Sequence, residues 1–410
     1  MTNFTRTADP EVNNIVNKKI QHDLDYICRK VKRLLGKNLH SILLCGGFGR
    51  GEGSVTISNC NVHIVNDYDF TIVLNTFSKI QYLRLYHQYH LPLETLAKEL
   101  ADTLDIKQVD LSPKPLSYFK DKTLKIENYE VKKGHILVYG NTDPTQLMPD
   151  WKAADIPLFE GTWLFRNRGL GLILAALYFI DSPIAHENKE NFIIECTKAQ
   201  MAIGDAALLS VGRYHHLYHR RLKITKASGF SNIPNAEALK ASYTTALIQK
   251  LTPDFSQFEN LDYKEYWFNT KDTFLSFFKF YEQKRLNQEF AEWSEYAQLK
   301  KTEDKIDLKR FAGNLIRTMK SNISLNGAKT NIQKSRSSYS VALVALTLAA
   351  FKRNGFDEKP MLKAAQLLNL EIPRDLKKSW IILAIATLEE IHPGGEVGKV
   401  VKTYKEKYVC

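Results

Sequence analysis

Two aspartates separated by one residue, Asp67 and Asp69, form the clearest pattern of chemistry-bearing residues in the chain. They begin a short apolar run typical of a β-strand. Because side chains alternate along a strand, both carboxylates point the same way, about 7 Å apart. Asp110 lies in a later apolar run, between Val109 and Leu111. Three carboxylates on neighbouring strands favour one or two Mg²⁺ ions, which prefer hard oxygen ligands shared with substrate phosphates.

The densest glycine cluster of the chain precedes these aspartates and runs from Gly46 to Ser54. Glycines let backbone N–H groups approach triphosphate oxygens without a side-chain clash. We therefore expect this loop, with Gly47 and Ser54 in it, to hold the β- and γ-phosphates of an NTP. Arg50 is expected to reach a phosphate. Glu52 is expected to pair with Arg50 or to approach the metal site.

The order of these features resembles the polymerase-β-type nucleotidyltransferase superfamily. Its pattern is a hydrophobic residue, Gly, Gly or Ser, then Asp-x-Asp on a strand, and a third carboxylate further on. The matching residues, all between positions 38 and 140, are Cys45-Gly46-Gly47, Asp67-Tyr68-Asp69 and Asp110. The resemblance implies that Gly46 and Gly47 contact the triphosphate. It also implies that Asp67 and Asp69 bind both metal ions. Asp110 would bind the catalytic ion and help to deprotonate the acceptor.

The spacing between the glycine pair and Asp67 is nearly twice that of the family. The extra residues, Val55–Val65, are expected either to form a small hairpin or to mean that the register of the match is different.

The second half of the chain contributes a further candidate, Lys198. The stretch Phe192–Leu222 has helical periodicity and predicts one long helix, on which Lys198 and Asp205 share a face. The same predicted helix carries Tyr214, Tyr218 and Arg221. In the resembling family the helical region after the catalytic domain often supplies a Lys to the triphosphate, so the resemblance implies this role for Lys198. An ordinary amphipathic helix with charged edges is the alternative.

The elements that must position the N-terminal residues follow from apolar periodicity. Short apolar runs predict strands at His40–Cys45, Asp67–Leu74, Ile106–Leu111 and His135–Tyr139, the third closed by Ser112-Pro113. Helical spacing predicts helices at Pro10–Leu35 and Leu93–Leu104, the latter starting at Pro92. Strands and helices in this order predict an α+β catalytic domain over residues 1–148, with a mixed sheet flanked by helices.

From residue 149 onward the sequence is typical of an all-α region. We predict a helical domain over residues 149–325 that completes the nucleotide and acceptor cleft, and a small C-terminal helical domain over residues 326–410. Helical periodicity covers Leu158–Ile180, Phe192–Leu222, Ala236–Leu251, Thr273–Leu299, Val341–Phe351, Met361–Leu368, Leu376–Ile391 and Val397–Tyr408. The polar stretch Asn322–Ser338 is expected to be a loop or hinge.

Composition limits the classes of partner and the cellular compartment that we expect for this protein. The formal net charge of +12 favours anionic partners such as NTPs or nucleic acid, although a generally basic protein is an equal alternative. The five cysteines include no CxxC pair, which is against a zinc ribbon and favours free thiols in a reducing cytosol. Since no apolar run is long enough to span a bilayer, we expect a cytoplasmic protein with no membrane partner.

These features predict a magnesium-dependent nucleotidyltransferase, with Mn²⁺ as the alternative ion. It would transfer an NMP from an NTP, expected to be ATP, to a hydroxyl on a small molecule, a protein or an RNA. One alternative is a nucleotide second-messenger synthase similar to the cyclic GMP-AMP synthases, although these typically carry Gly-Ser at the loop. Another is an inactive nucleic-acid- or protein-binding module on the same fold. The absence of GxxxxGK[ST] and GxGxxG motifs is against P-loop and Rossmann proteins.

Overall fold

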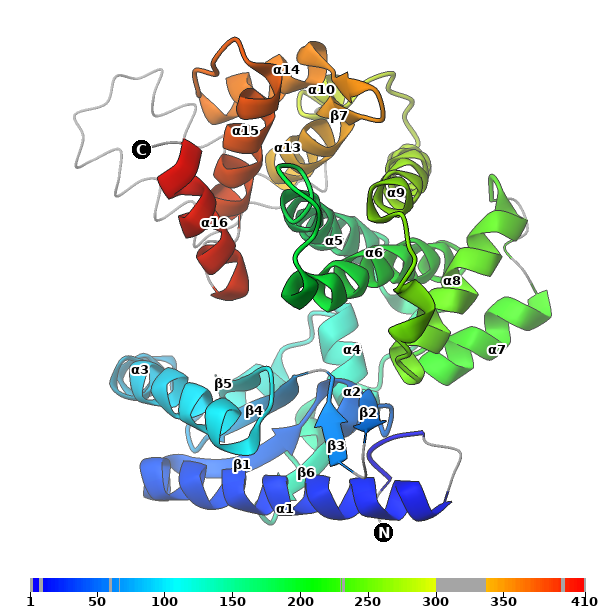
Figure 1. The fold of residues 1–410 in the computed structure, drawn as a ribbon. Coiled ribbons are helices and arrows are strands. Elements are labelled where there is room, and N and C mark those ends of the chain that lie inside the picture. Colours follow the sequence, from blue (N-terminus) through cyan, green and yellow to red (C-terminus); the bar gives the residue numbers. More distant parts are fainter. Residues whose placement is uncertain are drawn as a thin grey trace. The chain divides into compact units, whose positions relative to one another are not determined.

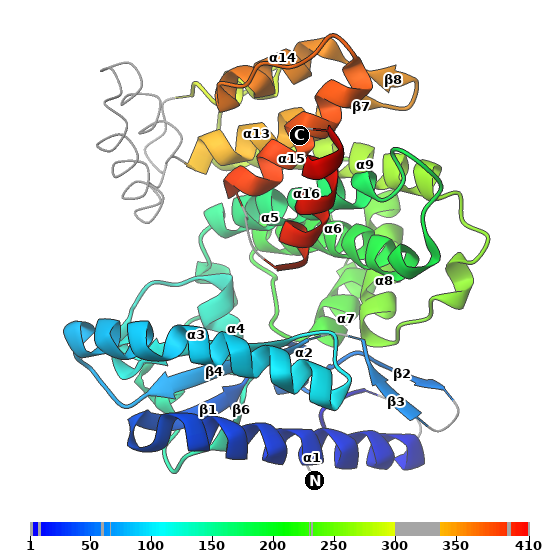
Figure 2. The same cartoon turned by 60° about the vertical axis from the view of Figure 1, so that its left-hand side comes forward.

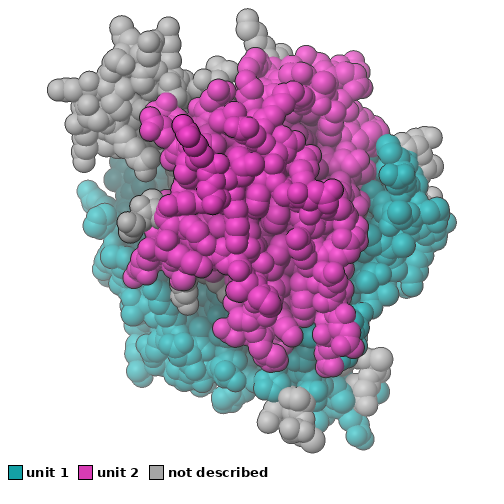
Figure 3. All heavy atoms as spheres, turned by 45° about the horizontal axis from the view of Figure 1, so that its top comes forward, with its two compact units in different colours: residues 1–160, 208–257 teal, residues 161–207, 258–410 magenta. Residues whose placement is uncertain are grey.

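The chain forms two compact units, which Figure 3 distinguishes by colour. The computed structural model describes residues 3–6, 10–58, 61–65, 67–228, 230, 233–299, 337–391 and 395–408. Unit 1 contains residues 1–160 and 208–257, and unit 2 contains residues 161–207 and 258–410. Unit 1 is therefore built from two separate stretches of sequence. The predicted division at residues 148 and 325 is a different one and stays a prediction.

Unit 1 contains a mixed sheet, a hairpin and the helices that surround them (Figure 1). Its strands are β1 (Leu39–Leu44), β2 (Val55–Ser58), β3 (Asn61–Ile64), β4 (Tyr68–Leu74), β5 (Val109–Pro115) and β6 (Ile136–Tyr139). Its helices are α1 (Pro10–Leu35), α2 (Gly46–Gly49), α3 (Lys79–Leu104), α4 (Ile126–Lys133), α7 (Tyr218–Ser228) and α8 (Ala236–Leu251).

The central sheet has the strand order β5-β4-β1-β6. Strand β1 is antiparallel to both β4 and β6, whereas β4 and β5 are parallel. The fold is therefore a mixed α and β structure with helices following the sheet, as predicted. The hairpin expected within Val55–Val65 is also confirmed, since β2 and β3 pair antiparallel.

Alternation along the strands creates two different faces of the sheet. Helices α1 and α3 cover one face, where Phe70 and Ile72 of β4 and Leu111 of β5 are buried (Figures 1 and 2). Val73 points to the opposite face, where it packs with Leu116, Phe119 and Val131. Because side chains alternate, Asp69 and Asp110 also belong to this second face.

The prediction that a helix starts at Pro92 is wrong, because Pro92 lies inside α3. Proline in a helix interior removes one hydrogen bond and crowds the preceding turn. The helix continues because leucines on both sides of it, Leu85 and Leu93, are buried in the same core. Pro92 itself is exposed, so water can satisfy the carbonyl that loses its partner.

The predicted strand end at Ser112-Pro113 is also wrong, because β5 continues to Pro115. Strand β5 lies at the edge of the sheet and pairs only with β4. Pro113 and Pro115 are two residues apart, so both lack their N–H on the same side of the strand, which is the open edge. Proline is tolerated in that position because no ladder bond is lost.

Two of the predicted long helices are each interrupted. The predicted helix Phe192–Leu222 is α6 (Lys189–Ser210) followed by α7, because Gly212 adopts φ +67° and turns the chain. The first part of the predicted helix Thr273–Leu299 belongs to α9 (Tyr263–Leu286). Helix α9 ends before Asn287, which adopts φ +47°. A left-handed residue after the last turn is a common helix stop, and it outweighs the continuing apolar periodicity.

Unit 2 is almost entirely helical. Its elements are α5 (Phe159–Leu177), α6, α9, α10 (Trp293–Tyr296), α13 (Ser337–Ala350), β7 (Phe351–Lys352), β8 (Gly355–Phe356), α14 (Glu358–Leu368), α15 (Leu376–Ile391) and α16 (Gly395–Tyr408). The polar stretch expected to be a loop or hinge lies mostly outside the described residues, and its last two residues begin α13. None of the helices in the described part of the chain has the length and apolarity that crossing a membrane requires.

Candidate functional site

Strands β4 and β5 bring two of the predicted aspartates side by side. Asp69 and Asp110 are direct partners in the parallel register of the two strands. Neighbouring strands are about 4.8 Å apart, and both side chains belong to the same face of the sheet. Asp67 comes immediately before β4. The three predicted carboxylates therefore lie near the first residues of two adjacent strands, close enough for the charges of Asp67 and Asp110 to act on Asp69.

Burial and the neighbouring carboxylates both disfavour the charged form of the aspartates in this cluster. Burial raises the pKa of Asp69 to about 7, and the charges of Asp67 and Asp110 add to the rise. Burial also raises the pKa of Asp110, followed by the charge of Asp67. The nearby cations Lys250 and Arg50 oppose the rise at Asp69 but do not cancel it. The cluster holds more negative charge than its own surroundings neutralise.

The glycine loop lies directly against Asp69. A Cβ atom on Gly46 would come within 1.9 Å of Asp69 Oδ2, and Gly46 has φ +60°. Only glycine satisfies both the backbone conformation and the close approach. The backbone N–H of Cys45 donates to the carbonyl of Asp69 at 2.7 Å. The start of the loop is thus attached to the strand that carries the carboxylates.

Gly47 is the second glycine that the sequence assigns to the triphosphate. It lies in α2, one residue beyond Gly46. The first N–H groups of a helix have no acceptor inside that helix. Gly46 thus lies against Asp69, whereas Gly47 packs against the backbone of Glu52.

Arg50, the predicted phosphate ligand, points into the body of unit 1. Its side chain is only 5% exposed, and Nη1 donates to Glu130 Oε2 on α4 at 2.9 Å. The guanidinium also lies over the ring of Tyr218, 4.9 Å from the ring centroid. In this conformation the charge of Arg50 is compensated within the protein.

Glu130 receives further donors from the 208–257 stretch of unit 1. Arg221 forms an ion pair with Glu130, and the hydroxyl of Tyr214 donates to its Oε1 at 2.5 Å. Burial alone would raise the pKa of Glu130, but Arg50 and Arg221 outweigh it and lower the pKa. Sequence reasoning missed this network, since its members lie far apart along the chain.

Ser54 connects the end of the glycine loop to α8. Its side chain is buried, and its hydroxyl donates to the backbone carbonyl of Lys250 at 2.5 Å. The charge of Lys250 lowers the pKa of Asp69, more strongly than that of Arg50 does. Sequence reasoning missed Lys250, because nothing in the helical pattern of α8 relates it to residues near the N-terminus.

Lys198 belongs to the other unit. It lies on α6, and its Nζ donates to Glu195 Oε1 at 2.8 Å. The side chain is 38% exposed. Its role toward a triphosphate stays a prediction.

The donor set fits Mg²⁺ in its chemistry. Aspartate oxygens are the ligands that Mg²⁺ prefers, and a divalent cation relieves the repulsion that raises the pKa of Asp69. Among the described residues, no three His, Cys, Asp or Glu side chains are arranged to hold an ion in this conformation. Mg²⁺ usually takes only one or two protein carboxylates and completes its shell with waters and phosphates.

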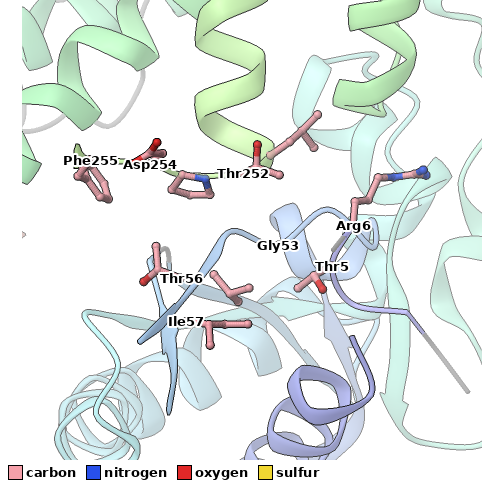
Figure 4. A pocket seen from close by; sticks show the side chains of 11 residues that line it. Thr5, Arg6, Gly53, Thr56, Ile57, Thr252, Asp254 and Phe255 are labelled. Atoms are coloured by element: carbon pink, nitrogen blue, oxygen red, sulfur yellow. The ribbon is translucent and has the colours of Figure 1, made fainter. Parts of the chain in front are cut away.

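A cavity of about 410 Å³ lies beside the far end of the glycine loop (Figure 4). Thr56 and Ile57 of β2 face it from one side, and Thr252 and Phe255 face it from the segment after α8. Its lining is Thr5, Arg6, Gly53, Val55, Thr56, Ile57, Leu251, Thr252, Pro253, Asp254 and Phe255. Apolar walls with a few polar groups are typical of small-molecule sites.

Comparisons with protein-family models, with curated proteins and with solved structures found no match for this chain. The functional interpretation therefore depends on the residues and the geometry described above.

Proposed function

We propose that the protein is a magnesium-dependent nucleotidyltransferase that moves an NMP from an NTP to an acceptor hydroxyl. The observation that carries the proposal is the register of Asp69 with Asp110 on parallel strands, with the backbone of Gly46 against Asp69. Carboxylates can bind a cation and a glycine loop can bind phosphates, so their proximity suits a metal-bound NTP. The raised pKa of Asp69 supports a cluster that a cation completes.

Asp67 and Asp69 would hold the metal ions, and Asp110 would share the catalytic one. When bound, Mg²⁺ would neutralise the carboxylates and the charge that develops on the leaving pyrophosphate. Gly46 and Gly47 would approach the β- and γ-phosphates through their backbone. Lys250, whose charge acts on Asp69, would add a cation on the α8 side of the cleft.

The reaction is an in-line displacement at the α-phosphorus. The acceptor oxygen forms a bond to phosphorus while the bond to the bridging oxygen breaks, and the electron pair leaves with pyrophosphate. Asp110 would take the proton of the acceptor hydroxyl. The chain thereby orients the acceptor and accepts one proton per turnover.

The test is pyrophosphate release from each of the four NTPs with Mg²⁺ or Mn²⁺, with products examined by mass spectrometry. The Asp67→Asn/Asp69→Asn double variant is run beside the wild type. Release by the wild type alone supports the proposal, and the mass of the adduct identifies the acceptor class. ATP is the expected NTP.

Two other outcomes separate the alternatives. An oligonucleotide or cyclic dinucleotide formed from NTPs without any added acceptor would indicate a second-messenger synthase. No release, together with no metal-dependent NTP binding by calorimetry, would overturn the enzyme proposal. Metal-independent, salt-sensitive RNA binding would then favour the binding module.

A further inference from the structure

Glu52, at the end of the glycine loop, is the most completely enclosed carboxylate beside the candidate site. It is 0% exposed. Its oxygens accept the backbone N–H groups of Tyr218 at 2.7 Å and His219 at 3.0 Å. His219 Nδ1 lies 2.5 Å from Oε1, and Arg6 Nε lies 3.4 Å from the same oxygen.

These contacts place a negative charge at the N-terminus of α7. The first N–H groups of a helix lack partners within it, and the helix dipole favours an anion there. Glu52 supplies that anion although it lies far from α7 in the sequence. Helix α7 is consequently attached to the glycine loop by several charge-assisted contacts.

Glu52 is also part of the loop backbone that the proposed function needs. Its own N–H donates to the carbonyl of Gly47 at 2.8 Å. A Cβ atom on Gly47 would lie 3.2 Å from the carbonyl oxygen of Glu52, so the two peptide groups pack closely. A displacement of Glu52 therefore displaces Gly47.

The second charged residue of the loop is attached to the same stretch of chain. Arg50 pairs with Glu130, which in turn pairs with Arg221 of α7. Both charged side chains of the loop are thus held, directly or through Glu130, by α7. The loop cannot reorient without breaking buried contacts at two points.

We propose that Glu52 is a positioning residue, which fixes the glycine loop for phosphate binding by anchoring it to the N-terminus of α7. This inference rests on the proposed nucleotidyltransferase function. The returning stretch 208–257 would then be required for nucleotide affinity, beyond its share of the fold. A carboxylate that only stabilises the protein would leave nucleotide affinity unchanged when altered.

Unit 2 offers a matched control for a purely structural role. Glu282 is also 0% exposed, and it accepts from Thr162 Oγ1 at 2.5 Å and Tyr296 Oη at 2.7 Å. It pairs with Arg285 at 2.7 Å. Glu52→Gln and Glu282→Gln therefore remove the same charge from equally buried sites, but only one of them touches the loop.

The experiment compares the two variants with the wild type by steady-state pyrophosphate release and by hydrogen exchange of peptides covering residues 46–54. For Glu52→Gln we expect KM for the NTP to rise about tenfold with a smaller change in kcat, because loop contacts to the phosphates persist throughout the reaction. Exchange in the loop peptides should also be faster. Glu282→Gln should change neither KM nor loop exchange, even where it lowers the unfolding temperature.

Unchanged KM and unchanged loop exchange in a folded Glu52→Gln would overturn the inference while leaving the enzyme proposal intact. If Glu52→Gln does not fold, His219→Ala removes one contact and leaves both backbone bonds, and the same two effects are expected at smaller size. A wild type with neither NTP turnover nor metal-dependent NTP binding would overturn the proposed function. Loop exchange would then decide the anchoring separately: no acceleration in Glu52→Gln would overturn it as well.

Discussion

Unit 1 contains two carboxylate sites that differ in how their charge is balanced. Asp69 is surrounded by other carboxylates, Asp67 and Asp110, and its pKa is raised to about 7. Glu130 is held between the guanidinium groups of Arg50 and Arg221, and its pKa is lowered. Burial raises the pKa at both sites, but the neighbouring charges reverse the net shift only at Glu130.

Glu130 forms a completed site, in which the protein itself supplies the counter-charge, whereas the aspartate cluster is an incomplete one. Glu130 finds all its counter-charge inside the protein, as buried structural carboxylates do. The aspartate cluster does not, and a protein retains closely spaced, uncompensated carboxylates mainly where a ligand or cation supplies the rest. Arg50 illustrates the contrast, since a residue expected at the phosphates belongs instead to the completed site.

The largest expected effect is the loss of turnover in Asp69→Asn. Removing a carboxylate that holds the metal costs several kcal/mol of transition-state stabilisation, or about 10³-fold in rate. Because the charge that is removed is uncompensated, the same variant should be more stable than the wild type at pH 8 without metal. Pyrophosphate release and urea unfolding measure the two effects. A variant with near-normal turnover would remove Asp69 from the site.

Glu130→Gln should behave in the opposite way. It leaves the buried guanidinium groups of Arg50 and Arg221 without a counter-charge, and we expect a loss of about 3 kcal/mol in the free energy of unfolding. Urea denaturation at pH 7 measures this loss. The control is Glu94→Gln, which removes a carboxylate that is 56% exposed and should change stability by less than about 0.5 kcal/mol. A loss equal to the control would contradict the view of Glu130 as a completed site.

Mg²⁺ should stabilise the wild type against unfolding. A ligand that binds only the folded state adds about 2.7 kcal/mol at a concentration one hundred times its Kd. The shift should disappear in Asp69→Asn and persist in Asp121→Asn, which changes an exposed carboxylate on the same unit. Differential scanning fluorimetry with and without EDTA provides the measurement. Equal shifts in both variants would indicate non-specific binding.

The stability of the wild type should also depend on pH because of Asp69. The pKa of Asp69 is higher in the folded state than in the unfolded chain, so the folded state binds more protons and loses stability as pH rises from about 4 to about 7. Relative to Asp69→Asn, the wild type should lose about 2 kcal/mol between pH 5 and pH 8, since partial access to water reduces the full effect. Urea unfolding without metal across this range tests it. A constant difference would mean that Asp69 titrates normally.

The smallest expected effect is that of Lys250→Met. Loss of one charge-assisted contact to a phosphate should raise KM for the NTP about tenfold. Lys240→Met, on the same helix α8, is the matched control and should leave KM unchanged. Steady-state pyrophosphate release compares them. If both variants behave alike, Lys250 contributes only to the general basic charge.

Much of unit 1 could be predicted from local sequence. Short apolar runs identify β1, β4 and β6 within a few residues, since each strand must bury at least one face. The bounds of α1 and α8 coincide with those predicted from helical spacing. Gly46 was also recognisable, because its positive φ and its close approach to Asp69 require glycine.

The tertiary structure decided what those residues contact. The sequence could not show that Arg50 and Glu52 both contact Tyr218 of α7, because Tyr218 lies in a stretch that returns to unit 1 after part of unit 2. It could not show Lys250 beside Asp69 for the same reason. Local propensity was also overridden at Pro92, where a shared core keeps one helix intact. Secondary structure and residue chemistry depend on near neighbours in sequence, whereas burial, counter-charge and pKa depend on neighbours in space.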